Sequence, residues 1–183
     1  VEANVLLDAE APGYRIAGRA VFANLDPQRA LADDAMPTGS LTARLDVALG
    51  GDSLANLEGT SALHVDRSVL EGIRVFDGTA QLRFGEGRMR VDTVHLETSA
   101  VALSASGALG LHAGRTDTLA LHARVDSLGG VRRLIGASLA DTVAGTVRID
   151  AVASGWLRGF ALDAAVDGTR LVLGANDART MSG

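Results

Sequence analysis

Apolar and polar residues alternate along most of the chain with a period of two, the pattern of β-strands that bury one face. In Leu41–Leu49 the odd positions are Leu, Ala or Val, and Thr42, Arg44 and Asp46 stand between them. The same alternation predicts further strands, at Leu119–Val125, Tyr14–Phe22, Leu57–Val65, Thr79–Phe84, Met89–Leu96, Val101–Leu111, Val143–Ala153, Phe160–Val166 and Leu171–Leu173. We therefore expect an all-β chain.

Short runs rich in Gly and Asp separate these strands and are typical of tight turns. The predicted turns are Gly50-Gly51-Asp52, Asp77-Gly78, Gly85-Glu86-Gly87, His112-Ala113-Gly114, Ser154-Gly155 and Asp167-Gly168. Such short links join antiparallel neighbours, so we expect a long antiparallel meander. Between Val91 and Val94 the apolar phase shifts, which predicts a β-bulge at Asp92 and Thr93.

Two segments without the alternation, Asp26–Ala35 and Ser127–Ile135, are predicted to be short helical connectors. They lie where the sequence repeats itself at a distance of about 104 residues, residues 25–72 matching residues 128–174. Within this match, Thr42–Gly51 and Thr146–Gly155 share four identities in ten positions. We expect one β segment over residues 1–183 with an internal repeat.

Composition and charge reduce the number of function classes that fit the chain. Aromatic residues are only 3% of the chain, whereas enzyme cores and small-ligand pockets usually draw on aromatic side chains. The net charge is -5 and the 17 basic residues are scattered, so nucleic acid is not an expected partner. The most apolar stretch, Ala100–Leu111, is about half the length of a membrane-spanning helix, and we expect none.

Candidate chemistry is sparse. His64, His95 and His122 occupy strand positions that face away from the apolar residues, and His112 lies in a predicted turn. No His-Xaa-His pair and no Gly-Xaa-Ser-Xaa-Gly motif is present, and Gly85–Gly87 is followed by a strand, not the helix of a phosphate loop. We expect no catalytic residue, metal or cofactor, and we therefore expect that the protein is not an enzyme.

One aromatic and basic patch, formed by Trp156, Arg158 and Phe160, follows the predicted turn at Ser154-Gly155. Trp and Arg favour the boundary between membrane and water, so the patch could contact a membrane or the rim of a groove. Packing that closes a hairpin is the interpretation we favour.

A longer pattern combines alternating Leu strands, a Gly-Xaa-Leu end, an Asp-Xaa-Leu-Xaa-Leu strand, a short connector and a Gly-Xaa-Val-Xaa-Ile strand. It is carried by Ser104–Leu111, Asp117–Leu121, Leu128–Leu134 and Gly145–Ile149. Looser versions of this pattern extend over most of the chain. In this pattern the sequence resembles the TamB and AsmA-like envelope proteins.

The resemblance implies an open groove made by a long curled sheet, apolar inside and polar outside. It implies phospholipid transport or envelope biogenesis between the inner and outer membranes, in the periplasm of a Gram-negative-type bacterium. Phospholipid acyl chains would be the partners, and outer-membrane assembly proteins would bind through regions outside this segment. Because the membrane anchor and C-terminal domain of full members have no counterpart here, we expect an internal stretch of the groove.

On this hypothesis, the apolar side chains of successive strands line the groove and contact lipid. The predicted lipid-contacting residues are Leu41, Leu45, Val47, Leu49, Leu63, Leu82, Phe84, Val101, Leu103, Leu109, Leu119, Leu121, Val125, Val147, Ile149, Leu162 and Val166. The alternative is a structural or adhesive β-solenoid or β-sandwich of a secreted or surface protein, in which the same residues form a closed core. A carbohydrate-binding sandwich is disfavoured because one Trp and one Tyr offer few platforms for sugar stacking.

Overall fold

The computed structural model describes residues 2–8, 13–33, 35–126, 143–173 and 176–182. Its elements in chain order are β1 (Glu2–Asp8), β2 (Tyr14–Leu25), α1 (Pro27–Leu31), β3 (Gly39–Gly51), β4 (Glu58–Val65), β5 (Ser68–Leu70), β6 (Ile73–Gly85), β7 (Arg88–Thr98), β8 (Val101–Gly110), β9 (Asp117–Val125), β10 (Val143–Trp156), β11 (Gly159–Leu173) and β12 (Asn176–Ser182). The all-β fold predicted from the alternation is confirmed.

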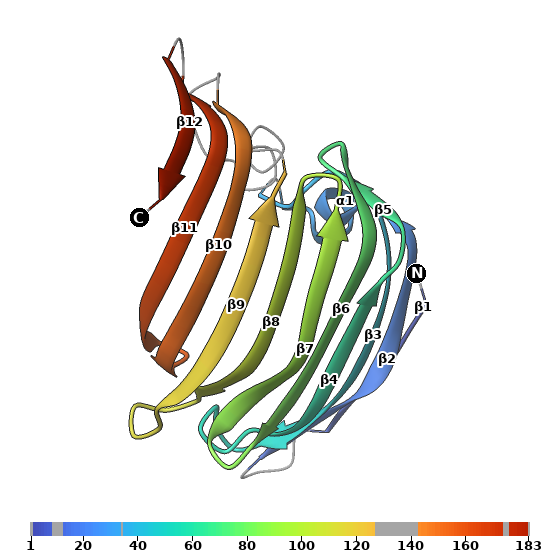
Figure 1. Cartoon of the computed structure of the whole chain (residues 1–183). Coiled ribbons are helices and arrows are strands. Elements are labelled where there is room, and N and C mark those ends of the chain that lie inside the picture. Colours follow the sequence, from blue (N-terminus) through green and yellow to red (C-terminus); the bar gives the residue numbers. More distant parts are fainter. Residues whose placement is uncertain (1, 9–12, 34, 127–142, 174–175, 183) are drawn as a thin grey trace.

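All the described strands belong to one 12-stranded sheet in the order β1-β2-β3-β4-β6-β7-β8-β9-β10-β11-β12 (Figure 1). Each strand on this path pairs with its neighbours antiparallel, as the short predicted links require. The short strand β5 is not part of this order and pairs with the ends of β3 and β6. The predicted meander is therefore confirmed.

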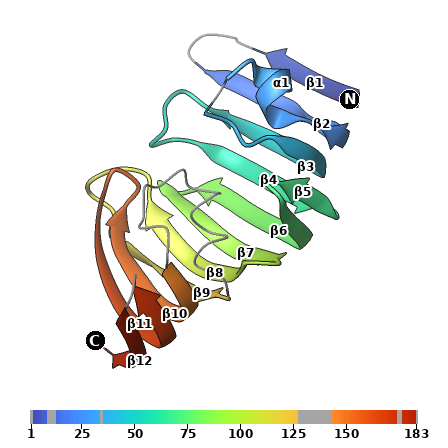
Figure 2. The same ribbon diagram turned by 90° about the horizontal axis from the view of Figure 1, so that it is seen from above.

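The sheet is an open, groove-like layer and not a closed barrel. Among the described residues β1 pairs with β2 and β12 pairs with β11, and no pairing joins these two outer strands. Seen from above, the strands follow one curved layer whose two edges stay apart (Figure 2). One face of this layer is therefore not folded back onto the other.

The β-bulge predicted in β7 is present. Leu82 of β6 lies opposite Val91, and the preceding residue of β6, Gln81, lies opposite Thr93. Asp92 is therefore the extra residue in β7, without a partner position in β6. On the other side of β7, the register with β8 also shifts between Val91 and Val94. The extra residue restores the apolar face after the shift in phase that the sequence displays.

Three predicted turns are wrong, because their residues lie inside strands. Asp77-Gly78 belongs to β6, where a Cβ on Gly78 would lie 3.2 Å from the Val65 Cβ and 3.3 Å from a Leu96 methyl. A small residue is required there by the side chains of the two flanking strands, so this glycine serves packing and not a turn.

The other two wrong turns are in β10 and β11. Ser154-Gly155 continues β10 as far as Trp156, and the chain reverses only at residues 157–158. Asp167-Gly168 pairs with β10 on one side and β12 on the other, so Phe160–Val166 and Leu171–Leu173 are parts of one strand. Strand pairing on both sides outweighs local turn preference at these positions. The strands β1, β5 and β12 were not predicted.

Only the first of the two predicted helical connectors can be compared with the structure. Helix α1 begins at Pro27, and the Asp26 side chain caps it by accepting a hydrogen bond from the Arg29 backbone N–H at 3.3 Å. It ends at Ala32, which has a left-handed backbone, so the helix is shorter than Asp26–Ala35. The second connector lies outside the described residues. The internal repeat stays a prediction, although its two best-matched stretches lie in β3 and β10.

Candidate functional site

The register places all the predicted lipid-contacting residues on one face of the sheet. Residues directly opposite each other in an antiparallel pair point to the same face, and positions two apart along a strand do so as well. Leu45 lies opposite Leu63, Leu82 opposite Val91, and Leu121 opposite Ala151. The seventeen residues come from β3, β4, β6, β8, β9, β10 and β11. We call this side of the sheet the apolar face.

A continuous row of apolar residues crosses most of the apolar face. Following the register from β2 to β11, its members are Ala20, Leu45, Leu63, Ala80, Val94, Ala105, Leu121, Ala151 and Ala164. At a spacing of about 4.8 Å between strands, these nine positions extend over roughly 38 Å. No polar side chain interrupts this row.

Side chains on the apolar face differ widely in burial. Leu109 and Val125 are 6% and 8% exposed, whereas Leu63, Val166 and Leu162 are 37%, 43% and 60% exposed. Large apolar side chains on this face are therefore left partly open to solvent.

The opposite side of the sheet, here called the polar face, carries the histidines. One row across it, displaced by one residue from the row described above, contains Arg44, His64, Thr79, His95, Ser104, His122 and Asp150. The sequence pattern predicted the direction in which His64, His95 and His122 point, but not their alignment, because alignment depends on strand register.

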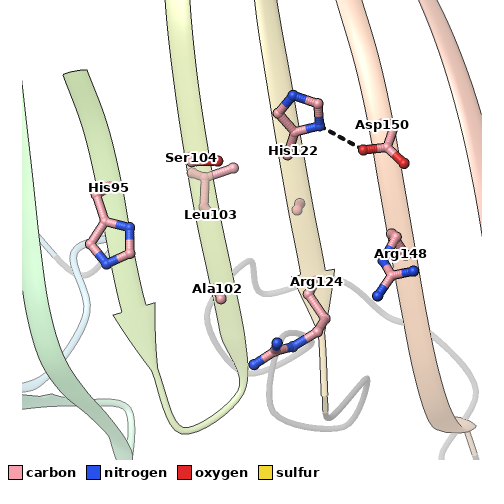
Figure 3. A pocket seen from close by; sticks show the side chains of 9 residues that line it. His95, Ala102, Leu103, Ser104, His122, Arg124, Arg148 and Asp150 are labelled. Carbon is pink, nitrogen blue, oxygen red and sulfur yellow. Dashed lines mark hydrogen bonds and ion pairs between the residues drawn. The ribbon is translucent and has the colours of Figure 1, made fainter.

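Part of this row borders a shallow depression of about 230 Å³ on the polar face (Figure 3). His95, Ser104, His122, Arg124, Arg148 and Asp150 line it. The His122 Nδ1 atom lies 2.6 Å from an Asp150 carboxylate oxygen. Within the described ranges, no group of three or more His, Asp or Glu side chains is placed to hold a metal ion.

The bulge in β7 places Asp92 in a two-pronged ion pair with Arg83 on the polar face. Arg83 donates from Nε and from one terminal nitrogen to the two Asp92 carboxylate oxygens, at 2.5 and 2.6 Å. These hydrogen bonds hold the pKa of Asp92 below its usual range and raise the pKa of Arg83 further. The extra residue that restores the apolar face thus also supplies a counter-ion on the polar face.

The patch around Trp156 closes a hairpin, in line with the favoured interpretation. A Cβ on Gly159 would lie 2.5 Å from the Trp156 ring nitrogen, so the indole packs directly on that glycine. The Leu157 backbone N–H donates to the Gly110 carbonyl at 2.8 Å and ties the hairpin to the end of β8. Phe160 remains 54% exposed, on the apolar face opposite Gly155.

No helix in the described part of the chain combines the length and apolar character needed to cross a membrane. Comparison of the chain with protein-family models, curated proteins and solved structures gives no match. The resemblance to the TamB and AsmA-like proteins therefore rests on the sequence pattern alone and stays a prediction.

Proposed function

We propose that the apolar face shields the acyl chains of phospholipids, as part of lipid transport or envelope biogenesis between two membranes. The acyl chains lie against the Leu, Val and Ala side chains, and the head groups stay in water. The proposal includes the periplasmic location and the TamB and AsmA-like family suggested by the sequence. It also includes docking to outer-membrane assembly proteins through other regions. It requires no covalent chemistry from this chain.

The observation that carries the proposal is the unbroken apolar row across nine strands of an open sheet. Soluble monomers rarely expose continuous apolar patches larger than a few hundred Å², and larger ones mark binding surfaces. A row roughly 38 Å long and more than one residue deep exceeds that scale. The face therefore needs a ligand or partner of matching apolar character.

The small size of the side chains suits an acyl chain. Ala and Val leave a smooth surface with few protrusions, and burying one methylene group contributes about 0.8 kcal/mol. Covering four methylenes would thus contribute roughly 3 kcal/mol, enough to hold a lipid while allowing it to slide. Low specificity along a uniform row is the property that transport along a groove requires.

The rival hypothesis, a closed-core structural or adhesive protein, needs a second layer over the apolar face. In the described ranges, the elements are the single sheet and the five-residue helix α1. A closed sandwich core would also bury Leu63, Val166 and Leu162, which are 37%, 43% and 60% exposed. These two features favour the open-groove hypothesis.

The test is native mass spectrometry combined with lipid extraction, on protein purified from bacteria without detergent. We expect co-purified phospholipid in near-stoichiometric amount, and its loss in Leu45→Asp and Leu121→Asp, which place a charge in the apolar row. Ala48→Asp is the matched control, because Ala48 is exposed on the polar face of the same strand as Leu45. Folded, lipid-free wild-type protein, or unchanged lipid in the Leu variants, would contradict the proposal.

A further inference from the structure

Three arginines gather around one depression at the β6–β7 hairpin. Arg83 at the end of β6 and Arg88 and Arg90 at the start of β7 line a shallow hollow of about 270 Å³, together with Glu86. Three of these groups are positive and one is negative, and two carboxylates beside the lining compensate part of the charge: Asp92 pairs with Arg83, and Asp117 lies 3.6 Å from Arg88. The Glu86 side chain is 83% exposed, so it neutralises the hollow poorly.

The strand register forces two of these positive charges together. Arg83 and Arg90 are directly opposite each other in the antiparallel pair, an arrangement that destabilises a sheet when the charges are alike. Asp92 accepts two hydrogen bonds from Arg83, and its negative charge also interacts with Arg90 over a longer distance. Arg90 is exposed and forms no hydrogen bond or ion pair with any described residue.

Arg88 also has unused donors. Its terminal nitrogens lie 3.7 Å from Glu86 and 3.6 Å from Asp117, both longer than hydrogen bonds. Its Nε atom is buried without a hydrogen-bond partner in the described structure, as is the Asp117 Oδ2 atom, so the donors left for a ligand are the terminal nitrogens. Arg90 and the terminal nitrogens of Arg88 thus have hydrogen-bonding capacity that the described residues leave unfilled.

We propose that this hollow binds a phosphate-type anion through Arg88 and Arg90, with Arg83 adding positive field. A guanidinium presents two parallel N–H donors that match phosphate oxygens, and a bound anion relieves the repulsion between Arg83 and Arg90. The phosphate can belong to a soluble phosphate ester or to a lipid head group. The site goes beyond acyl-chain shielding and stands without it.

The depression in Figure 3 is the weaker candidate for such a site. Arg124 and Arg148 are directly opposite each other there too. However, Asp126 already accepts from Arg124, at 3.1 and 3.2 Å, and the Asp150 carboxylate lies in the lining. The hollow at the β6–β7 hairpin has the larger excess of free positive donors.

The test is a titration of the full chain with inorganic phosphate at constant ionic strength, followed by NMR of the arginine Nε–Hε groups. We expect saturable shifts, weakened about tenfold or more by Arg90→Gln and by Arg88→Gln, because each removes charged hydrogen bonds. Arg90→Lys should bind phosphate more tightly than Arg90→Gln but less tightly than wild type, because lysine keeps the positive charge and loses the two parallel donors of the guanidinium. Circular dichroism verifies that each variant is folded.

Arg44→Gln is the matched control: Arg44 is exposed on the polar face and forms no ion pair with a described residue. Sedimentation with phosphatidic acid vesicles, compared with phosphatidylcholine vesicles, distinguishes a head group from a soluble phosphate. Binding that depends on Arg90 in either assay supports the site. No saturable binding in both, or equal weakening by Arg44→Gln, overturns it. Leu121→Asp should retain phosphate binding, which separates this site from the acyl-chain proposal.

Discussion

At the scale of single residues, leucines on the same face of the sheet differ greatly in burial. Leu109 is 6% exposed, whereas Leu162, also a Leu on the apolar face, is 60% exposed. Leu162 lies opposite the small Ala153 near the edge of the sheet, where few side chains flank it. Residue type alone therefore does not decide which leucines support the fold and which remain available to a ligand.

Truncation of these two leucines should separate the two roles. We expect Leu109→Ala to lower the free energy of unfolding by about 2–3 kcal/mol, because it leaves a gap among packed neighbours. Leu162→Ala should change it by less than about 0.5 kcal/mol. Urea denaturation measures both values. Equal costs would mean that the exposed leucine is covered in solution, which would contradict an open face.

The Arg83–Asp92 pair makes a prediction about pH. The pKa of Asp92 is lowered in the folded state, mainly by the hydrogen bonds from Arg83, so ionised Asp92 stabilises the fold above about pH 4. That contribution is lost as the pH falls through the lowered pKa. We expect Asp92→Asn to be less stable than wild type at neutral pH, and the difference to shrink on acidification.

The pH experiment follows urea unfolding of both proteins between neutral pH and the acid limit of the fold. Asp163→Asn controls for the loss of one negative charge, because Asp163 is exposed and has no hydrogen bond or ion pair in the described structure. A difference between wild type and Asp92→Asn that widens toward low pH would reverse the sign and refute the argument.

At the scale of elements, strands approach each other closely where glycine permits it. Gly59 in β4 has a φ of +124°, and a Cβ there would collide with the Ala48 carbonyl oxygen of β3. Gly85, at the end of β6, has open space around its Cα and a φ outside the left-handed region. The two glycines thus differ in backbone conformation and in the space available to a side chain.

We expect Gly59→Ala to destabilise the protein by about 1–3 kcal/mol, the usual cost of a strained backbone conformation. Gly85→Ala is the matched control and should stay within about 0.5 kcal/mol of wild type. Thermal and urea unfolding measure the difference. If both substitutions cost the same, the close approach of β3 and β4 would not depend on glycine.

At the scale of the whole molecule, an open sheet with an apolar face should gain stability from a ligand that covers that face. A ligand that binds only the folded state raises the free energy of unfolding with its concentration, by about 2.7 kcal/mol at a hundredfold excess over Kd. Two unmatched sheet edges, at β1 and β12 among the described strands, leave room for a long ligand to cross the face.

We expect lysophosphatidylcholine, below its critical micelle concentration, to raise the unfolding midpoint of the wild-type chain. Leu121→Asp should abolish this rise, because the charge lies within the apolar row. Ala120→Asp, on the polar face of the same strand, should preserve it. Differential scanning calorimetry measures the midpoints. A wild-type midpoint that does not respond would favour a face already covered by protein.

The alternation of apolar and polar residues was enough to predict the all-β class, the face of most strands and the bulge at Asp92 and Thr93. Each of these follows from local alternation, because side chains two residues apart necessarily share a face. Turn chemistry was less informative. Asp77-Gly78 and Asp167-Gly168 have ideal turn composition, yet both are held in strands by pairing on two sides.

The alignment of the strands and the open form of the sheet could not be predicted from the sequence. The apolar row through Leu45, Leu63 and Leu121, the histidine row and the opposition of Arg83 and Arg90 all depend on register between different strands. The open edges likewise depend on the pairings that β1 and β12 make. Periodicity along one strand carries no information about its neighbour, because strand pairing is a long-range choice made by backbone hydrogen bonds and cross-strand packing.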